Sequence, residues 1–392
     1  MRRVLHQPST MNNDEFDQMV YLKYRYESSQ RYLFRTKYRK SDSKYWQRYL
    51  DPHIVYDSEF QLLFRMSRDK FLELLEKIMN HRVFHRNTGR PQHHVCFQLM
   101  MFLFYLGMSG DGAKHEVVGL HFHISKGAVR SSLKRVLTAI LSMKDDYIKW
   151  PDVEERSRLA DSFLGLHGFP NCIGAIDGTH IGLVARPSWC GQDFCTRKFQ
   201  YAIQAQLICD HNARILDVYS GWPGSVHDHR VWRNSPIFNN IQNYFSHGQY
   251  LVADSAYTSS PYIVPGYKSA PLLPLTSNKQ FFNFKLSQAR IRIEHTNGLL
   301  KSRFPILKCM NINIDKDRDV VKVLRILMAC CILHNFLRSD PWYLEDSIRN
   351  MLSSAVDEDE PEVFGEVQLD FEHGESRRTQ IYDFILEYFR YR

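Results

Sequence analysis

Three carboxylates lie where a solvent-exposed acid would not be expected. Asp177 lies in an apolar, β-rich run, Asp254 ends a second apolar run, and Glu294 lies in a helical segment. Burying an acid as an anion is costly unless positive charge compensates it, and one divalent cation compensates several acids at once. Hard cations such as Mg²⁺ take oxygen ligands and keep waters for a substrate. The three acids therefore predict a site for Mg²⁺ or Mn²⁺, formed by separate elements.

Such a site would act on phosphodiesters. Two divalent ions held side by side can activate a water or a DNA 3′-hydroxyl, and they can stabilise the leaving oxygen. Because three acids are enough to hold both ions, Asp177, Asp254 and Glu294 are the predicted catalytic and metal-binding residues. Close to Glu294 along the chain, Arg290 and Lys301 are predicted to neutralise DNA phosphates.

Each acid also has a local explanation that needs no metal. Asp177 precedes a glycine and could shape a tight turn, and Asp254 precedes a serine and could cap the next element. Glu294 could pair with Arg290 one helical turn earlier.

The elements that carry the two aspartates have the pattern of strands. The run at 171–185 is β-rich, with a break predicted at Gly178, and the runs at 201–210 and 214–222 are joined by a turn. These three runs are predicted to be adjacent antiparallel strands. The run at 249–257 is predicted to be a buried strand with Asp254 at its tip.

Helices complete the prediction for this half of the chain. Helical patterns cover about 227–244, about 283–304 and 322–337, whereas the Pro- and Gly-rich stretch 261–274 is predicted to be a loop. Strands first and helices later, around one sheet, indicate an α/β architecture with helices on the faces of the sheet.

The first half of the chain is helical instead. From Ser58 to about Met143, apolar residues recur at spacings of three and four. A candidate helix at 111–121, a tight connection, and a second helix capped by Ser125 make a helix-turn-helix arrangement. The basic residues on the outer face of the second helix are the predicted DNA contacts: Lys126, Arg130 and Lys134. The alternative is that they only form the solvated face of a surface helix.

The charge distribution favours a polyanionic partner. The chain has 392 residues and a net charge of +8. Basic and aromatic residues interleave between residues 23 and 49, which suits DNA, whereas residues 357–375 are acidic and are predicted to be solvated and partly disordered. No secretory signal and no apolar run long enough to cross a bilayer is visible, so we expect the protein to act inside the cell, without a membrane.

The eight cysteines show no C-x-x-C pair, and several lie in apolar runs. This pattern indicates reduced thiols that pack as small hydrophobic side chains. A zinc site from Cys190, Cys195 and His180 is the alternative, but its fourth ligand is missing.

Together with the helical region, five ordered blocks cover about residues 60–337: GAIDGTHI with Asp177, GWPGSVHDHRVW with Asp228, LVADSAY with Asp254, RIRIEHTNGLLKSRFPIL with Glu294, and ACCILHNFL. In this order the blocks resemble the PIF/Harbinger-type transposases and their domesticated nuclease-like relatives, in the DDE superfamily. Ala253 and Ala256 stand where that family commonly has glycine, but both are small and the acid between them is kept.

The resemblance implies an RNase H-like fold, with the two aspartates on strands and the glutamate on a helix. It implies a metal-dependent enzyme that cleaves DNA at terminal inverted repeats and joins the 3′ ends to a target site. Asp228 is the reserve candidate for a metal ligand. The resemblance further implies a Myb-like accessory protein and a location in the nucleus, with the cytoplasm as a second location, and it allows a homo-oligomer.

The implied organisation has four parts. They are a basic, aromatic arm at 1–57, a helix-turn-helix-like DNA-binding region at 58–150, an RNase H-like DDE endonuclease domain at 151–340, and a C-terminal extension with the acidic segment at 341–392.

Two other functions stay open at this point. A domesticated transposase would keep the fold and the acids as a DNA-binding or partner-recruiting protein without catalysis. The pair His227 and Asp228 also fits a metal-dependent phosphohydrolase of the His-Asp type, although the strand-like runs disagree with the all-helical fold of those enzymes.

Overall fold

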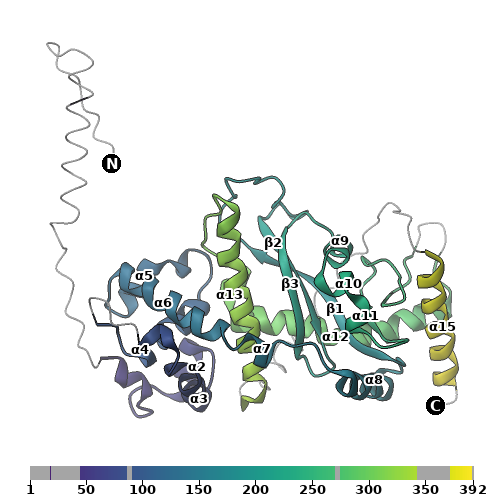
Figure 1. The fold of residues 1–392 in the computed structure, drawn as a ribbon, viewed down its shortest axis with the longest axis horizontal. Coiled ribbons are helices and arrows are strands. Elements are labelled where there is room, and N and C mark those ends of the chain that lie inside the picture. Colours follow the sequence, from purple (N-terminus) through teal and green to yellow (C-terminus); the bar gives the residue numbers. More distant parts are fainter. Residues whose placement is uncertain (1–17, 19–44, 86–90, 270–273, 342–370, 391–392) are drawn as a thin grey trace.

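The computed structural model describes residues 18, 45–85, 91–269, 274–341 and 371–390. Most of the predicted basic arm and most of the predicted acidic segment therefore lie outside the described residues. The rest forms a helical region and a sheet with helices on its faces (Figure 1).

The sheet is mixed, with five strands in the order β3-β2-β1-β4-β5. Pairing is antiparallel between β1 and β2 and between β2 and β3, and parallel between β1 and β4 and between β4 and β5. The strands are β1 (Cys172–Gly182), β2 (Ala202–Cys209), β3 (Ile215–Pro223), β4 (Tyr250–Ala253) and β5 (Ile263–Pro265). The predicted trio of antiparallel strands and the predicted α/β architecture with flanking helices are confirmed.

Two predictions about strands were wrong. The first strand is not broken at Gly178, which pairs with Gln206 in the middle of the β1–β2 ladder. The predicted loop at 261–274 contains β5, which pairs with β4 from Ile263 to Pro265. Proline is tolerated there because β5 is an edge strand, where an amide N–H on the outer side needs no partner in the sheet.

Helices cover both faces of the sheet. On one face α12 (Ser277–Arg303) packs against β1, β2 and β4, and α13 (Asp317–Phe336) packs along β3. The opposite face carries a separate apolar cluster, in which Ile176 and Ile208 of the sheet join Trp232 of α9 (Asp228–Arg233). The helix α8 (Val153–His167) packs against β1.

The helices after β3 depart from the prediction. The helix expected over 227–244 is divided into α9, α10 (Pro236–Asn239) and α11 (Ile241–Tyr244). The division has a local cause, because Ser235 caps α10 through its side chain and Pro236 begins that helix, where a proline cannot continue the one before. In contrast, α12 begins earlier than expected, since Thr276 accepts a hydrogen bond from Lys279 N and caps it.

The helical region agrees with the predicted period. Its α-helices are α2 (Asp57–Phe64), α3 (Arg68–Met79), α4 (Val95–Leu106), α5 (His115–His121), α6 (Lys126–Leu141) and α7 (Lys144–Tyr147), and 3-10 turns cover 45–50, 82–84 and 110–113. The candidate helix at 111–121 is thus a 3-10 turn followed by α5. Ser125 caps α6 as predicted, accepting a hydrogen bond from Ala128 N at 3.2 Å.

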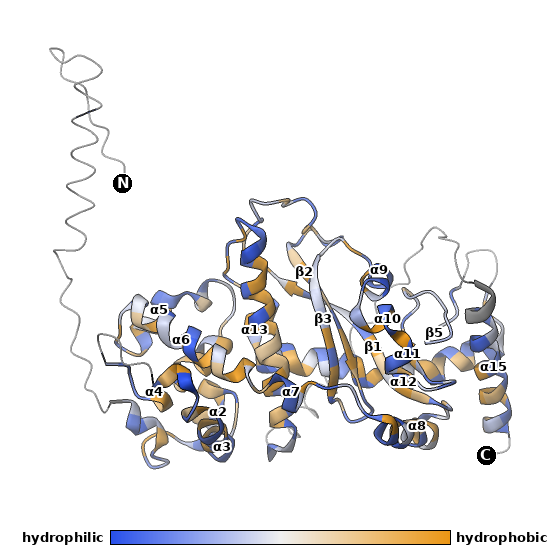
Figure 2. Cartoon of the chain, in the orientation of Figure 1, coloured by the Kyte–Doolittle hydropathy of each residue, from blue (hydrophilic) through white to orange (hydrophobic). Residues whose placement is uncertain are grey.

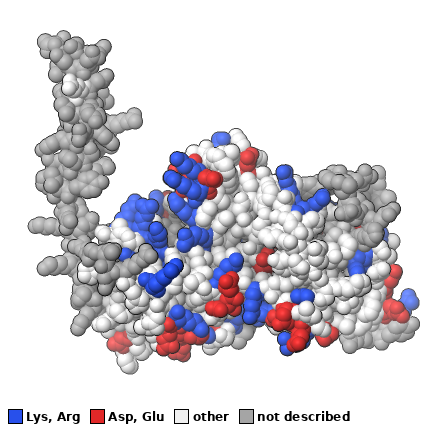
Figure 3. Space-filling model, in the orientation of Figure 1, with Lys and Arg blue, Asp and Glu red and all other residues white. Residues whose placement is uncertain are grey.

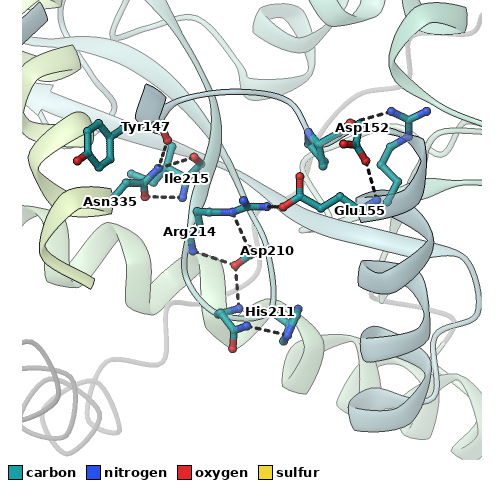
Figure 4. Close-up of polar contacts among 11 residues, drawn as sticks. Tyr147, Asp152, Glu155, Asp210, His211, Arg214, Ile215 and Asn335 are labelled. Carbon is teal, nitrogen blue, oxygen red and sulfur yellow. Dashed lines mark hydrogen bonds and ion pairs between the residues drawn. The ribbon is translucent and has the colours of Figure 1, made fainter. Parts of the chain in front are cut away.

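Helix α13 is apolar along most of its length (Figure 2). The stretch Asp317–Ser339 is long and apolar enough to cross a membrane, but 61% of its most apolar window is buried inside the protein, as in a core helix. Near its end, Asn335 accepts from Ile215 N at 2.9 Å and donates to the carbonyls of Ile215 and Tyr147 at 2.8 Å each (Figure 4). The block ACCILHNFL therefore fastens α13 to β3 and α7.

The turn between β2 and β3 is held by hydrogen bonds within the turn and by an ion pair with α8. Asp210 accepts hydrogen bonds from the backbone N–H groups of Asn212 and Arg214, and the Arg214 guanidinium forms an ion pair with Glu155 of α8 at 2.7 Å (Figure 4).

The last described element is α15 (Phe371–Arg390), which packs against α12 and β5. Ile381 and Ile385 are buried there, and Tyr382 packs edge-on or tilted against Tyr267 and Phe282. The C-terminal extension therefore contributes to the core through residues 371–390. One cluster of buried apolar residues extends from Tyr49 in the helical region to Ile385 in α15.

Candidate active site

Asp177 is the centre of the candidate site. It lies within β1, and its side chain is 18% exposed. Asn297 Nδ2 donates a hydrogen bond to Asp177 Oδ2 at 2.8 Å, and Arg290 Nη2 lies 3.9 Å from Asp177 Oδ1. Both partners belong to α12, so this helix presents its polar face to the acid on β1. The tight-turn explanation for Asp177 is wrong, because β1 continues through it as a strand.

Asp254 follows the last residue of β4. The parallel register pairs Ala175 with Val252, so continuing both chains by two residues brings Asp177 and Asp254 side by side. Asp254 Oδ1 also accepts a hydrogen bond from Ala256 N at 3.0 Å. Asp254 thus forms a turn at the end of β4 and does not cap the next element, β5, which begins at Ile263, and the hydrogen bond fixes the carboxylate beside β1.

Glu294 completes the predicted trio from α12. Arg290 Nη2 lies 3.4 Å from Glu294 Oε1, so the local ion pair expected from the sequence is formed. The same guanidinium nitrogen also approaches Asp177, and the pair is therefore part of the site. The side chain of Glu294 is 50% exposed, whereas that of Arg290 is 16% exposed.

The site is a cluster of carboxylates whose negative charge exceeds the positive charge that nearby side chains supply. Burial raises the pKa of Asp177 to about 7, the Arg290 guanidinium opposes this rise, and the carboxylates of Asp254, Asp228 and Glu294 add to it. Removing Asp177 from water and placing other acids near it both disfavour its anion. A positive charge bound at this point would lower the pKa again.

Asp228 reaches β1 at the next residue. An added Cβ at Gly178 would overlap the carboxylate of Asp228, so only glycine leaves room for it. Successive residues of a strand point to opposite faces, and Asp228 therefore approaches β1 from the face opposite to Asp177. Gln204 of β2 donates a hydrogen bond to Asp228 Oδ1. The structure thus places the reserve candidate close to Asp177 but across the strand from it.

Tyr257 is the residue that sequence reasoning missed. It is 3% exposed, and within the described part of the chain its hydroxyl has no hydrogen-bond partner. Burial, with smaller effects from the carboxylates of Asp228, Asp177 and Asp254, raises the pKa of this hydroxyl above its ordinary value. A neutral O–H donor is therefore buried beside the acids. The signal was present in the block LVADSAY, where tyrosine follows Asp254 by three residues.

The predicted DNA-contacting residues fall into two groups. Arg290 and Lys301 are partly buried, and burial lowers the pKa of Lys301 while the nearby Asp177 raises it. The three on α6 are exposed: Lys126, Arg130 and Lys134. Lys126 forms an ion pair with Glu116.

The exposed basic residues of α6 continue onto α13. Arg325 of α13 donates a hydrogen bond from Nη2 to Oγ1 of Thr138 on α6 at 3.4 Å, and Figure 3 shows Lys and Arg gathered over both helices.

The metal prediction has to be set against this arrangement. Among the residues that the structure describes, no group of three or more His, Cys, Asp or Glu side chains could hold a metal ion as arranged. The Arg290 guanidinium instead supplies positive charge to both Asp177 and Glu294. The donors nevertheless fit a hard cation in type, since they are carboxylates and an unpartnered hydroxyl around an aspartate whose pKa is raised.

The described residues give the zinc alternative no support. All eight cysteines are free thiols, and Cys190, Cys195 and His180 form no metal-holding group within the described residues. His180 Nε2 lies 3.0 Å from the carbonyl oxygen of Gly224, which occupies this ring nitrogen. Five of the cysteines are buried, which confirms the prediction of core thiols for those five.

Comparison with known proteins identifies one family. Residues 176–335 match the family model described as DDE superfamily endonuclease. The chain is 25% identical over 249 residues to the Arabidopsis thaliana protein named antagonist of like heterochromatin protein 1, covering 61% of this chain and 62% of that protein. It is 26% identical over 232 residues to human HARBI1, a protein named as a candidate nuclease, covering 59% of this chain and 64% of the human protein.

A third relative, an ALP1-like protein of Arabidopsis thaliana, is 26% identical, and the match covers 58% of this chain and 57% of that protein. The chain thus spans about three fifths of the length of the curated relatives it matches. No solved structure matches it.

Proposed function

Because the chain belongs to the Harbinger-type DDE family, we propose that it is a metal-dependent endonuclease that cleaves DNA phosphodiesters and joins the 3′ ends to a target site. The observation that carries the proposal is the meeting of Asp177 and Asp254 at adjacent parallel strands, with Arg290 of α12 contacting both Asp177 and Glu294. Acids that are distant in the sequence would not be collected around one buried carboxylate for local reasons alone.

The fold supports an RNase H-like assignment. The first three strands are antiparallel neighbours, and β4 and β5 add in parallel on the other side of β1. The two aspartates then lie at the centre of the sheet and the glutamate on a helix across its face, as the family resemblance implies. The proposed endonuclease domain is the stretch 151–340.

The residues have distinct parts in the proposed reaction. Asp177, Asp254 and Glu294 would hold Mg²⁺ or Mn²⁺, which when bound supplies Lewis-acid activation of the attacking oxygen and stabilisation of the leaving oxygen. Asn297 orients the Asp177 carboxylate through its hydrogen bond. Arg290 balances the acids before DNA binds, and it is placed to meet phosphate afterwards.

The helical region would hold the DNA. Helices α5 and α6 are joined by a short turn, and α6 exposes Lys126, Arg130 and Lys134 on its outer face, which fits a helix-turn-helix with α6 as the second helix. Terminal inverted repeats are the proposed substrate. A nuclear location, a Myb-like accessory protein and a homo-oligomer accompany this proposal.

The test is cleavage of a labelled DNA duplex that carries the element's ends, in Mg²⁺ or Mn²⁺. We expect Asp254→Asn and Glu294→Gln to lose cleavage by more than 100-fold, on the order expected when a metal-ion effect of several kcal/mol is removed. DNA binding measured by fluorescence anisotropy should stay within about twofold, because α6 is untouched. The matched control is Asp161→Asn, which changes an exposed acid on α8 and should cleave normally. Wild-type cleavage by Asp254→Asn would overturn the proposal.

A second function is favoured by one observation. The name of the first Arabidopsis relative describes an antagonist of like heterochromatin protein 1, not an enzyme that cleaves DNA. Tight DNA binding without cutting by wild type or variant would assign this chain to a domesticated, non-catalytic role. Terminal inverted repeats flanking the gene would favour an active element instead.

A further inference from the structure

Phe199 is unusual because its aromatic ring is exposed and so contributes little buried apolar surface to the fold. It lies in the connection between β1 and β2 and is 89% exposed, the highest value among the large apolar side chains that the structure describes. The backbone around it is a closed turn. Thr196 N donates to Gln200 O at 2.8 Å, and Phe199 N donates to Thr196 O at 3.0 Å.

The backbone of Phe199 is also strained. Its φ is +55°, in the left-handed region where glycine and asparagine are usual and a bulky side chain is an outlier. A turn of this shape could be made with glycine at no cost in strain or exposed apolar area. Strain of this kind is found where the surrounding structure over-determines a conformation, commonly at functional sites.

The residues beside Phe199 are cationic. Arg197 and Lys198 are both exposed, and Arg197 Nη2 lies 3.0 Å from Nδ1 of His227. In the whole connection 183–201 the acidic residue is Asp193 alone, against Arg186, Arg197 and Lys198. An exposed aromatic ring next to two cations fits a nucleic acid, because the ring can stack on a base while the cations meet phosphates.

The turn is anchored to the candidate active site. Gly224 packs so closely on it that an added Cβ would lie 3.0 Å from both Phe194 O and Thr196 Cγ2. From there the chain continues through His227 to Asp228, whose carboxylate packs against Gly178 beside Asp177. Figure 1 shows that the β1–β2 connection lies at the same end of the sheet as α9. DNA bound at the acids would therefore pass close to this turn.

We propose that Phe199 stacks on an unpaired base of the DNA whose phosphodiester lies at the acids, while Arg197 and Lys198 hold the flanking phosphates. This inference rests on the proposed function and deepens it, since it assigns recognition of locally opened DNA to a turn outside the three acids. Base stacking on an aromatic ring is tolerant of sequence, so Phe199 would select for an unstacked base and not for a particular one.

The experiment compares two DNAs that carry the element's ends, a full duplex and a fork with unpaired bases at the cleavage end. The fork contains 2-aminopurine as the first unpaired base, and all measurements use the full chain in EDTA, so that catalysis plays no part. Phe199→Gly is the main variant, because glycine suits the left-handed backbone and keeps the turn. We expect it to weaken binding of the fork about tenfold. It should also abolish the protein-induced change in 2-aminopurine fluorescence and leave duplex binding within twofold.

Two further variants keep the result specific. Phe199→Trp retains an aromatic ring and should retain fork binding, whereas Phe284→Ala removes another exposed phenylalanine, on α12, and should bind both DNAs as wild type does.

Equal loss on duplex and fork, or an unchanged fluorescence signal in Phe199→Gly, would overturn the stacking role and point to a protein partner for the ring. Failure of the wild-type chain to bind either DNA would overturn the proposed function itself, and the two failures are therefore distinguishable.

Discussion

At the scale of single residues, the closest packing in the site is found at a glycine, which has no side chain. Gly178 follows Asp177 in β1, and its Cα faces the carboxylate of Asp228, which is held by Gln204. Its φ is not in the left-handed region, so the glycine is required for close approach and not for a turn. Asp177 and Asp228 can thus lie on opposite faces of the same short stretch of β1.

Gly178→Ala should therefore displace Asp228. We expect cleavage to be lost and the free energy of unfolding to fall by roughly 1–3 kcal/mol, as for other overpacked positions. Urea denaturation and the cleavage assay measure the two effects.

Gly298→Ala is the matched control, because it lies on α12 one turn after Glu294 and nothing lies within 4 Å of the added methyl group. Its free energy of unfolding should rise by about 0.5–1 kcal/mol, since glycine weakens a helix interior. Normal cleavage by Gly178→Ala would show that Asp228 has no part in the site.

His334 gives the protein a pH dependence away from the acids. It is fully buried at the end of α13, and its Nε2 lies 2.9 Å from the carbonyl oxygen of Ala213. Burial lowers the pKa of His334 to about 3. Histidine in an unfolded chain titrates near 6.5, so between these two values the unfolded chain carries a proton that the native chain does not.

His334 should therefore destabilise the protein increasingly as the pH falls from about 6.5 toward 3, and it has no such effect above about pH 6.5. The slope contributed by one such proton approaches about 1.4 kcal/mol per pH unit. Urea denaturation of wild type and His334→Gln at pH 7, 6 and 5 measures it, and we expect a shallower slope in the variant. Parallel slopes for the two proteins would contradict this assignment.

At the scale of elements, α13 and α12 carry most of the positioning. Asn335 ties α13 to both the N–H and the carbonyl of Ile215 in β3, and to the carbonyl of Tyr147, the last residue of α7. The position of α12 in turn sets where Arg290, Glu294 and Asn297 meet β1. A helix that is fastened by side-chain hydrogen bonds to backbone groups has one defined register on the sheet.

Asn335→Leu should loosen this fastening. Because it leaves backbone groups of Ile215 and Tyr147 without their partner, we expect the free energy of unfolding to fall by about 2–4 kcal/mol. Thermal and urea denaturation measure the change. Ser302→Ala, on the neighbouring helix, removes one side-chain hydrogen bond to Leu299 O and serves as the mild comparison. Equal stability of Asn335→Leu and wild type would show that apolar packing alone holds α13.

At the scale of the whole molecule, the helical region and the sheet share one core. The cluster of buried apolar residues that begins at Tyr49 includes Ile140 of α6, Val252 of β4 and Ile385 of α15. Arg325 of α13 also donates to Thr138 of α6. The predicted boundary at 150–151 remains a prediction about the chain, but no gap in the core coincides with it among the described residues.

A shared core predicts a single cooperative unfolding transition. Helix content, followed by circular dichroism at 222 nm, and tryptophan fluorescence should report the same midpoint, because neither region can lose its packing alone. Urea denaturation with both probes checks this. Two separate midpoints would mean that the helical region and the sheet are independent domains.

Much of this protein followed from sequence pattern. The three antiparallel strands, the strand that ends before Asp254, the helix of Glu294 and the cap at Ser125 were all predicted correctly, because hydrophobic period and capping are local properties. The two wrong predictions also rested on local signals. Gly178 suggested a break in the first strand, and the prolines within 261–274 suggested a loop. Both signals were outweighed by pairing with strands that are distant in the sequence.

The sequence by itself determined which residues carry charge, which segments alternate and which acids sit in apolar surroundings. Only the tertiary structure decided that β4 pairs with β1 and so brings Asp254 to Asp177, that Asp228 packs on Gly178, and that Arg290 contacts two of the acids. It also decided the placement of Tyr257, which is buried beside the acids, and of Phe199, which is exposed on the connection between β1 and β2. The physical reason is that these contacts join segments far apart in the chain, and packing of the whole core selects them where no local pattern can.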